Sequence, residues 1–169
     1  MSLAESKVDW CLNKVEKELK ETGKHRGLVR VKPDLGKARD FVSKAEHYLR
    51  ATEYLKKGDF SDISASTVFY SMYHCLLAIA EKFGYESRNQ DFTFHLIHSL
   101  IEQGKIGLEE EFMRKITSLE VKTDDEKTCT MIREQYQYGT ELSMKDNTYK
   151  ELLQLAKEVI IKTKEILNE

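Results

Sequence analysis

The stretch ARDFVSKAEHYLRATEYLKKGDFSDISASTVFYSMYHCLLAIAEKF, residues 38–83, decides the fold class. Its apolar residues return every three or four positions on both sides of one short break around Gly58, a period typical of helices with one buried face. They are Ala38, Phe41, Val42, Ala45, Tyr48, Leu49 and Leu55 before the break, and Val68, Phe69, Met72, Tyr73, Leu76, Leu77, Ala80 and Phe83 after it. Two long helices, over about 34–57 and 61–83, should therefore pack as an antiparallel hairpin.

The remainder of the chain also predicts helices. An N-terminal helix should end near Gly23, shorter helices should cover about 91–102, 108–119 and 124–142, and a last long helix about 147–167. No convincing strand appears. The sequence thus predicts an all-α, antiparallel up-and-down helical bundle with extra short helices. Residues 1–33 form an N-terminal helix and basic linker, and residues 34–169 form the bundle, as a single globular domain overall.

Composition narrows the class of protein. The chain has 169 residues, 40% hydrophobic and 33% charged, with a net charge of −2, which argues against a strongly basic nucleic-acid module. Its three cysteines include no CxxC pair, so neither a disulfide framework nor a zinc knuckle is expected, and a reduced cytoplasmic setting is favoured. No apolar run approaches about 18 residues, so no transmembrane helix is expected.

Positive charge gathers in GKHRGLVRVKPD, residues 23–34. No acidic residue lies between Glu21 and Asp34, and Val29 to Val31 alternate as an extended segment would. The segment is either a solvated linker or an arm that contacts phosphate groups, with Arg26 and Arg30 as the candidate contacts.

A second candidate site lies in YESRNQDFTFHLIHSL, residues 85–100. On a helix that starts near Asp91, a narrow polar stripe of His95, His98 and Glu102 should lie opposite the apolar face, at the surface or in a groove. The histidines are structural, or they bind a metal together with Glu102. In a third interpretation, Arg88 grips a phosphate and His95 transfers a proton.

Several stretches together resemble a HEPN domain of the prokaryotic, nucleotidyltransferase-associated type. They are the hairpin with its KGD break, the run Phe69–His74, the segment IREQYQYGTE (132–141) and the closing LLQLAKEVIIKTKEIL (152–167). The resemblance covers about residues 34 to 168 and favours the third interpretation.

The resemblance implies an all-α bundle that forms a homodimer and is encoded beside a small nucleotidyltransferase as a toxin–antitoxin pair. Catalytic members of the family cleave RNA without a metal or other cofactor, using an Arg-polar-x(3–5)-His motif from both protomers. Arg88, Asn89 and His95 match that motif, which makes them the candidate catalytic residues.

Four further residues are candidates for binding RNA or a nucleotide. Arg133 is either a solvated arginine whose stem packs on an aromatic ring or a phosphate ligand, with Tyr136 or else Tyr138 as a stacking surface. Tyr70 and His74 either lie at the edge of the core or line the same groove as His95.

The expected function is therefore that of a cytoplasmic HEPN-domain protein that binds RNA or a nucleotide, with a metal-independent ribonuclease toxin as its catalytic form. The alternative is a non-catalytic bundle that holds a partner protein such as a nucleotidyltransferase. An enzyme requires Arg88 and His95 to converge on an open cleft, whereas a scaffold needs only an apolar face left over after folding.

Overall fold

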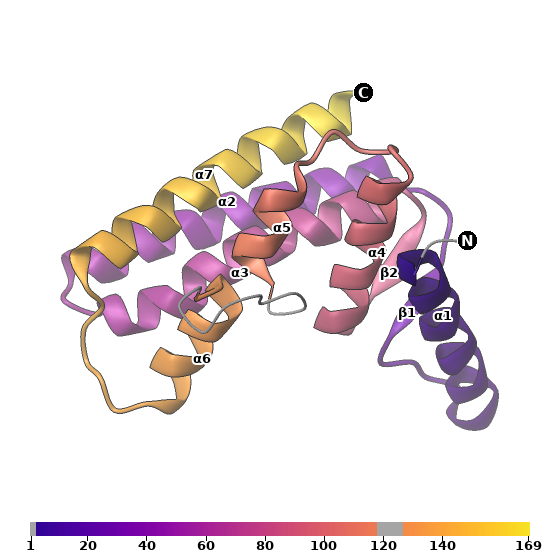
Figure 1. Cartoon of the computed structure of the whole chain (residues 1–169), viewed down its shortest axis with the longest axis horizontal. Helices are drawn as coiled ribbons and strands as arrows, with labels where there is room; N and C mark the ends of the chain where they lie inside the picture. Colours follow the sequence, from indigo (N-terminus) through magenta and orange to yellow (C-terminus); the bar gives the residue numbers. More distant parts are fainter. Residues whose placement is uncertain (1–2, 118–126) are drawn as a thin grey trace.

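The computed structural model describes residues 3–117 and 127–169, and nearly all of its regular structure is helical (Figure 1). The all-α prediction is confirmed. The elements are α1 (Leu3–Thr22), β1 (Leu28–Arg30), α2 (Leu35–Lys57), α3 (Ser61–Lys82), β2 (Tyr85–Ser87), α4 (Gln90–Glu102), α5 (Glu110–Ile116), α6 (Cys129–Tyr138) and α7 (Asp146–Asn168).

The α2–α3 hairpin has the predicted bounds and the predicted turn at Gly58. Small buried side chains let the two helices approach closely, and their hydroxyl groups donate across the contact. Ser71 Oγ donates to the Ala45 carbonyl at 2.8 Å, and Ser64 Oγ donates to the Thr52 carbonyl at 3.1 Å. The buried hydroxyls are thus satisfied, as polar groups in a core must be.

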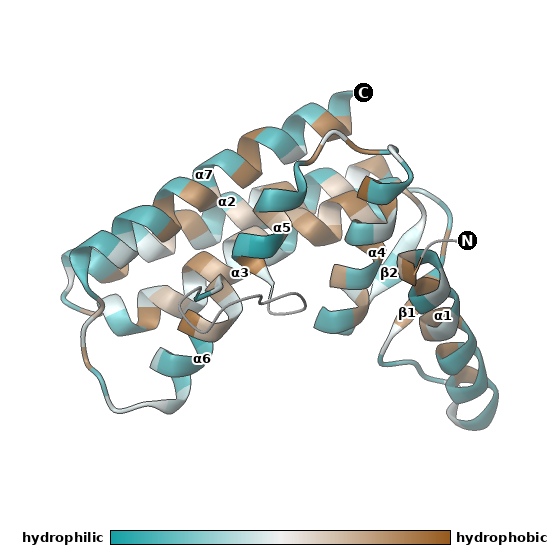
Figure 2. Cartoon of the chain, viewed as in Figure 1, coloured by the Kyte–Doolittle hydropathy of each residue, from teal (hydrophilic) through white to brown (hydrophobic). Residues whose placement is uncertain are grey.

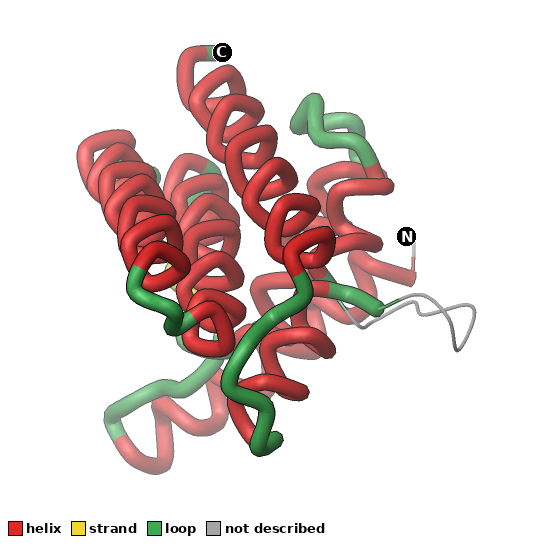
Figure 3. Tube along the Cα trace, turned by 90° about the vertical axis from the view of Figure 1, so that its left-hand side faces the viewer, coloured by secondary structure: helices red, strands yellow, loops and turns green. Residues whose placement is uncertain are grey.

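The last helix, α7, runs in the same direction as α3 rather than opposite to it (Figure 1), and Figure 3 shows it from the side with the C-terminus at its end. Asp146 at its start pairs with Lys56 at the end of α2 across 2.5 Å, and the Ile166 carbonyl near its end accepts from Lys82 at the end of α3. The predicted up-and-down order therefore holds for α2 and α3 but is wrong for α7. The excursion through α4, α5 and α6 brings the chain back to the end of the bundle at which α2 meets α3.

The expectation that the chain contains no strand is also wrong. β1 and β2 form a two-stranded antiparallel ribbon in which Leu28 pairs with Ser87 and Arg30 with Tyr85. Strands of three residues are too short to show a period in the sequence. Gly84, at a φ of +78°, makes the turn from α3 into the ribbon, and a Cβ there would lie 2.8 Å from the Val31 carbonyl oxygen.

The helix α1 packs against α4, and its buried residues Val8 and Cys11 belong to the main hydrophobic core. In Figure 2 it is hydrophilic along most of its length, with isolated hydrophobic bands. The central helix α3 is long and apolar enough to cross a membrane by length and composition, but 61% of its most apolar window is buried inside the fold. A core helix of a helical bundle has the same composition.

The two short helices differ in their ends from the prediction. α5 covers only Glu110–Ile116, so residues 108, 109 and 117 of the helix predicted over 108–119 are not helical, and residues 118–119 lie outside the described residues. The acidic start predicted for the next helix, Asp124–Glu126, also lies outside them. α6 instead has Thr128 as its N-cap, whose hydroxyl accepts from the Met131 N–H.

Candidate nucleic-acid interface

The segment that carries the Arg–His motif begins where the ribbon ends and α4 starts. Asn89 is the N-cap of α4, and its side-chain oxygen accepts a hydrogen bond from the Phe92 N–H at 3.0 Å. The Arg88 side chain is 59% exposed and pairs with Glu86 across 3.0 Å. The asparagine thus fixes the start of the helix, and a carboxylate of the ribbon orients the arginine.

Glu86 contacts the side chains of three residues from different segments, Lys37, Arg88 and His25. His25 Nε2 lies 3.2 Å and Lys37 Nζ 3.5 Å from its carboxylate, in addition to Arg88. Burial would raise the pKa of Glu86, but the charges of Lys37 and Arg88 more than offset burial and hold this pKa below its usual value near 4.5. Neither Glu86 nor His25 was predicted from the sequence, because the two residues are far apart in the chain and only the ribbon brings them into contact.

His95 of α4 lies within electrostatic reach of Lys7 on α1. It is half-buried, and this burial, helped by the positive charge of Lys7, lowers the pKa of His95 below its usual value near 6.5, although Asp91 opposes the shift. The imidazole is therefore neutral near pH 7 and able to accept a proton. Within the described residues, no hydrogen bond, ion pair or ring contact joins His95 to Arg88, so a single chain does not bring this pair into contact.

The expected surface stripe is wrong for His98, whose side chain is buried. Its Nδ1 lies 2.9 Å from Glu110 Oε1 of α5, and its Nε2 is buried without a partner. The reason is that α5 turns back against α4 and covers this part of the stripe. Across residues 3–117 and 127–169, no group of three or more His, Cys, Asp or Glu side chains is placed to hold a metal ion. The geometry therefore gives the metal interpretation of His95, His98 and Glu102 no support.

A hollow of about 480 Å³ opens between the second half of α1, the turn before β1 and the start of α4. Two predicted site residues from distant segments, Arg26 and Asn89, both line it. The Arg88 N–H donates to the Gly27 carbonyl at 2.9 Å and ties the basic segment to the helix start. The hollow and its rim present six side chains that we call the basic patch: Trp10, Lys14, Lys17, Arg26, Asn89 and Phe92.

Gly27 allows this close approach. A Cβ at this position would lie 2.3 Å from Val15 of α1 and 2.8 Å from the ring of Phe92 in α4. Contacts that short do not occur between real side chains, so any larger residue would push α1 and α4 apart. The glycine therefore sets the width of the hollow.

The aromatic part of the basic patch is exposed. Trp10 is 56% exposed and meets Phe92 edge to face, with ring centroids 5.9 Å apart. Lys14 Nζ lies 4.9 Å from the Trp10 ring centroid, within the range of a cation–π contact. The sequence contains a signal for this site, since the only tryptophan lies on the polar side of an amphipathic helix with a lysine one turn later.

The lining of the hollow has a small excess of positive charge, with Lys14, Lys17 and Arg26 against Glu18 and Glu21. In the part of the chain that the structure describes, the side chains of Lys17 and Arg26 form no ion pair, and both are exposed. The two carboxylates that line the hollow are Glu18 and Glu21, and Glu18 already accepts from the Arg26 backbone N–H at 3.1 Å. The patch thus presents cations beside an exposed indole ring, a combination that suits single-stranded nucleic acid.

Arg133 occupies a different junction, between α3, α4 and α6. Its guanidinium carbon lies 4.5 Å from the Phe69 ring centroid, and its NH1 donates to Gln90 Oε1 at 3.1 Å. Only 11% of the side chain is exposed, Glu134 lies 3.3 Å from NH2, and Nε is buried without a partner. Three segments that carry the HEPN resemblance, namely Phe69–His74, Arg88–His95 and residues 132–141, therefore meet at this arginine.

The other predicted aromatic residues lie in or near the core. His74 stacks on Tyr48 of α2, with ring centroids 5.1 Å apart, and its Nδ1 lies 2.7 Å from the Tyr70 carbonyl oxygen. Burial lowers the pKa of His74 below its usual value near 6.5. Tyr136 is half-buried and packs against the main core. Within the described residues, no hydrogen bond or ring contact joins any of these side chains to His95.

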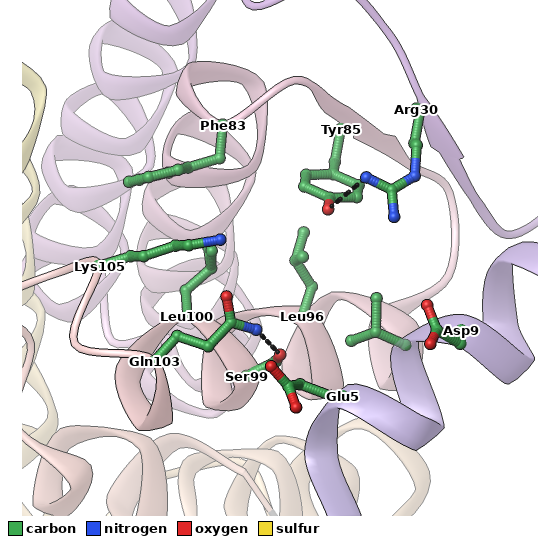
Figure 4. A pocket seen from close by; sticks show the side chains of 11 residues that line it. Glu5, Asp9, Arg30, Phe83, Tyr85, Leu96, Ser99, Leu100, Gln103 and Lys105 are labelled. Carbon is green, nitrogen blue, oxygen red and sulfur yellow. Dashed lines mark hydrogen bonds between the residues drawn. The ribbon is translucent and has the colours of Figure 1, made fainter. Parts of the chain in front are cut away.

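Arg30 points away from the basic patch into a larger hollow of about 610 Å³ between α1, the ribbon and α4 (Figure 4). Its NH1 donates to the Tyr85 hydroxyl at 3.2 Å, and its guanidinium carbon lies 5.4 Å from the centroid of that ring. The two arginines of the basic segment thus serve different surfaces.

Comparisons with known proteins assign no family to this chain. A scan against protein-family models finds no match, and no curated protein matches the sequence.

Proposed function

We propose that this protein is a HEPN-like module that binds RNA through the basic patch. The observation that carries the proposal is the convergence of Arg26 and Asn89, together with Phe92, beside the exposed Trp10. The cations neutralise backbone phosphates and the indole stacks on a base. Arg26 comes from the predicted phosphate-contacting arm, and Asn89 comes from the segment that resembles the family's RNA site.

The HEPN-like class is supported by the architecture around Arg133. The helical hairpin has its short Gly58 turn, α7 packs on α3, and three distant segments of the resemblance meet at a single buried arginine. The same resemblance is the basis for proposing a homodimer in the cytoplasm, with a small nucleotidyltransferase as the protein partner in a toxin–antitoxin pair.

Metal-independent cleavage of RNA is the second candidate function, and the neutral imidazole of His95 favours it. In this scheme Arg88 of one protomer stabilises the charge on the phosphate while His95 of the other moves the proton. Arg88 must first leave Glu86, because the carboxylate otherwise neutralises it. RNA binding needs no such rearrangement and is therefore the function that the geometry supports better.

Fluorescence anisotropy with a labelled single-stranded RNA tests binding. Trp10→Ala should weaken binding by about 5- to 100-fold, the usual loss for one stacked base. Replacing Lys17 and Arg26 by Gln should lower the slope of log Kd against log salt by about 1.4, or about 0.7 for each phosphate contact. The control is Tyr54→Ala, which removes an aromatic side chain that is 78% exposed on α2. Equal affinities for all variants would contradict RNA binding by the basic patch and favour the partner-binding alternative.

Cleavage of the same RNA in EDTA tests the second candidate. His95→Ala should lower the rate by about 10²- to 10⁴-fold. Glu86→Gln frees Arg88 from its ion pair and should raise the rate if Arg88 acts on the phosphate. Wild-type protein that binds RNA and leaves it intact would exclude cleavage while preserving the binding function.

A further inference from the structure

The charged residues of α1 are separated onto two sides of the helix. Three lysines and the tryptophan share one side, which we call the basic flank: Lys7, Trp10, Lys14 and Lys17. At about 100° per residue they lie within about 80° of one another, and all four are exposed. The acidic residues of the same turns lie on another side, about 140° away: Glu5, Asp9 and Glu16. The basic flank therefore offers positive charge to an anionic ligand without an acid among its cations.

The basic flank extends one turn beyond the basic patch. The helices α1 and α4 pack antiparallel, because Trp10 meets Phe92 near the start of α4, with ring centroids 5.9 Å apart, whereas the first turns of α1 share a hollow with Gln103 at its end. One turn from the aromatic contact leads back along α1 to Lys7 and forward along α4 to His95. The positive charge of Lys7 lowers the pKa of His95, as this placement requires.

The imidazole of His95 is open to a ligand. Within the described residues it forms no hydrogen bond, and neither of its ring nitrogens is enclosed, in contrast to Nε2 of His98. The charged or titratable groups that act on it are Lys7 on α1 and Asp91 and His98 on α4, and His98 is itself held by Glu110 of α5 at 2.9 Å. Asp91 is exposed, so water screens its charge. Lys7 forms no ion pair with any residue in 3–117 or 127–169, which leaves a cation and an imidazole for one anion.

The packing of α1 favours RNA over an anionic membrane as the ligand. A helix that lies in a membrane surface inserts its apolar face into the lipid. The apolar face of α1 is instead part of the core, since Val8, Cys11 and Val15 are each at most 6% exposed. What remains at the surface is an indole ring between lysines, and this alternation matches the bases and phosphates of a single strand.

We propose that a single RNA strand lies along the basic flank and that one of its phosphates binds between Lys7 and His95 of the same chain. This inference rests on the proposed RNA binding and extends that site by one helical turn. Lys7 and Lys17 are about 15 Å apart along the helix axis, the length of about five nucleotides stacked about 3.4 Å apart. The family motif joins His95 to an arginine of a second protomer, whereas this phosphate site needs one chain alone.

Fluorescence anisotropy with a labelled single-stranded RNA of about ten nucleotides tests the part of Lys7. Lys7→Gln should lower the slope of log Kd against log salt by about 0.7, the value of one phosphate contact on a single strand. Lys7→Arg should keep the wild-type slope. The matched control is Lys20→Gln, which removes a lysine that pairs with Glu16 at 2.9 Å on the acidic side of α1 and should leave the slope unchanged.

Proton NMR of the histidine rings tests the part of His95, with His95→Gln to assign its signal. Saturation with the same RNA should raise the pKa of His95, because a phosphate beside an imidazole favours the protonated form. The pKa of His47, which is exposed on α2, should not change on binding.

An unchanged salt slope in Lys7→Gln, or an unchanged pKa of His95 on binding, would overturn this inference. The proposed function would still stand if the variants of Lys17 and Arg26 lowered the slope. Wild-type protein that binds no RNA would overturn both. Tighter binding to vesicles of phosphatidylserine and phosphatidylcholine than to the RNA would overturn the inference and assign the basic flank to a membrane surface.

Discussion

The bundle of α2, α3 and α7 and the unit of α1, the ribbon and α4 use their charged residues differently. In the bundle, lysines of one helix pair with acids of another, as in Lys157–Glu53 at 3.3 Å and Lys164–Glu46 at 2.5 Å. In the ribbon unit the ion pairs are local, as in Arg88–Glu86 at 3.0 Å and Lys20–Glu16 at 2.9 Å, and Lys17, Arg26 and Lys105 form no ion pair with any described residue. Charges that are paired within the fold contribute to its structure, whereas unpaired cations beside hollows remain for ligands.

The two regions also differ in how their elements are joined. Hydroxyl groups bond α2 to α3 inside the bundle, whereas three hollows lie between α1 and its neighbours; one further hollow, of about 530 Å³, lies between α6 and α7. Substitutions in the bundle should therefore change stability, and those in the ribbon unit should change binding. The predictions that follow test this division, beginning with the largest expected effect.

Phe69→Ala should have the largest effect on stability. Phe69 is fully buried in α3 and contacts the rings of Tyr70 and Tyr73 as well as the guanidinium of Arg133. Its loss should lower the free energy of unfolding by about 3–5 kcal/mol, measured by urea denaturation. A change below 1 kcal/mol would mean that the junction around Arg133 is not part of the cooperative core.

Lys37→Met should have the second-largest effect on stability, because Lys37 forms ion pairs with residues of both regions. Lys37 Nζ lies 2.6 Å from Glu81, a carboxylate that is 3% exposed, and 3.5 Å from Glu86 of the ribbon. An unpaired buried carboxylate is costly, but Lys37 is itself 42% exposed and water screens the pair, so the expected loss is about 1.5–3 kcal/mol. The double variant with Glu81→Gln should recover part of it, and additive losses would contradict the pairing.

Gly27→Ala should cost about 1–3 kcal/mol, because the new Cβ overlaps Val15 and Phe92. Hydrogen exchange should accelerate in α1 and leave α7 unchanged if the ribbon unit yields by itself. Gly107→Ala is the control, since nothing lies within 4 Å of a Cβ at that position. Equal acceleration in α7 would show that the two regions unfold together.

The smallest effect concerns pH. His74 in the bundle and His95 in the ribbon unit both have pKa values below the usual value near 6.5, mainly because of burial. Between the folded and the unfolded pKa values the unfolded chain binds more protons, so stability should fall as the pH drops below about 6.5. Replacing either histidine with Gln should flatten the dependence, as followed by thermal melts from about pH 7 to about pH 5. The exposed His47 is the control.

The long helices could be predicted from the sequence because their buried faces repeat with the helical period. Ala38 and Val42 on α2, and Val68 and Phe69 on α3, are all buried as that period requires. The direction of α7 could not be predicted, since an apolar stripe is the same for a parallel and an antiparallel neighbour.

The sequence predicted individual residues of the candidate site but not how they lie relative to one another. Arg26 and Asn89 were each identified, yet only the ribbon brings them to one hollow. His98 was misplaced because α5, which covers it, has no sequence pattern that reveals its partner. An arginine at position 88 suits phosphate binding, and this could be predicted from the sequence. Its pairing with Glu86 could not, because that pairing depends on the backbone geometry of the ribbon.

The ribbon has a consequence for the order of folding. Its strands flank the α2–α3 hairpin in the chain, so pairing Leu28 with Ser87 joins residues that are far apart in sequence. Closing a loop of that length from a disordered chain costs entropy, but a formed hairpin already holds both ends of the loop side by side. The hairpin, whose contacts are local, should therefore form first and the ribbon afterwards at little further entropic cost. The basic patch beside the ribbon is therefore complete only after β1 and β2 have paired.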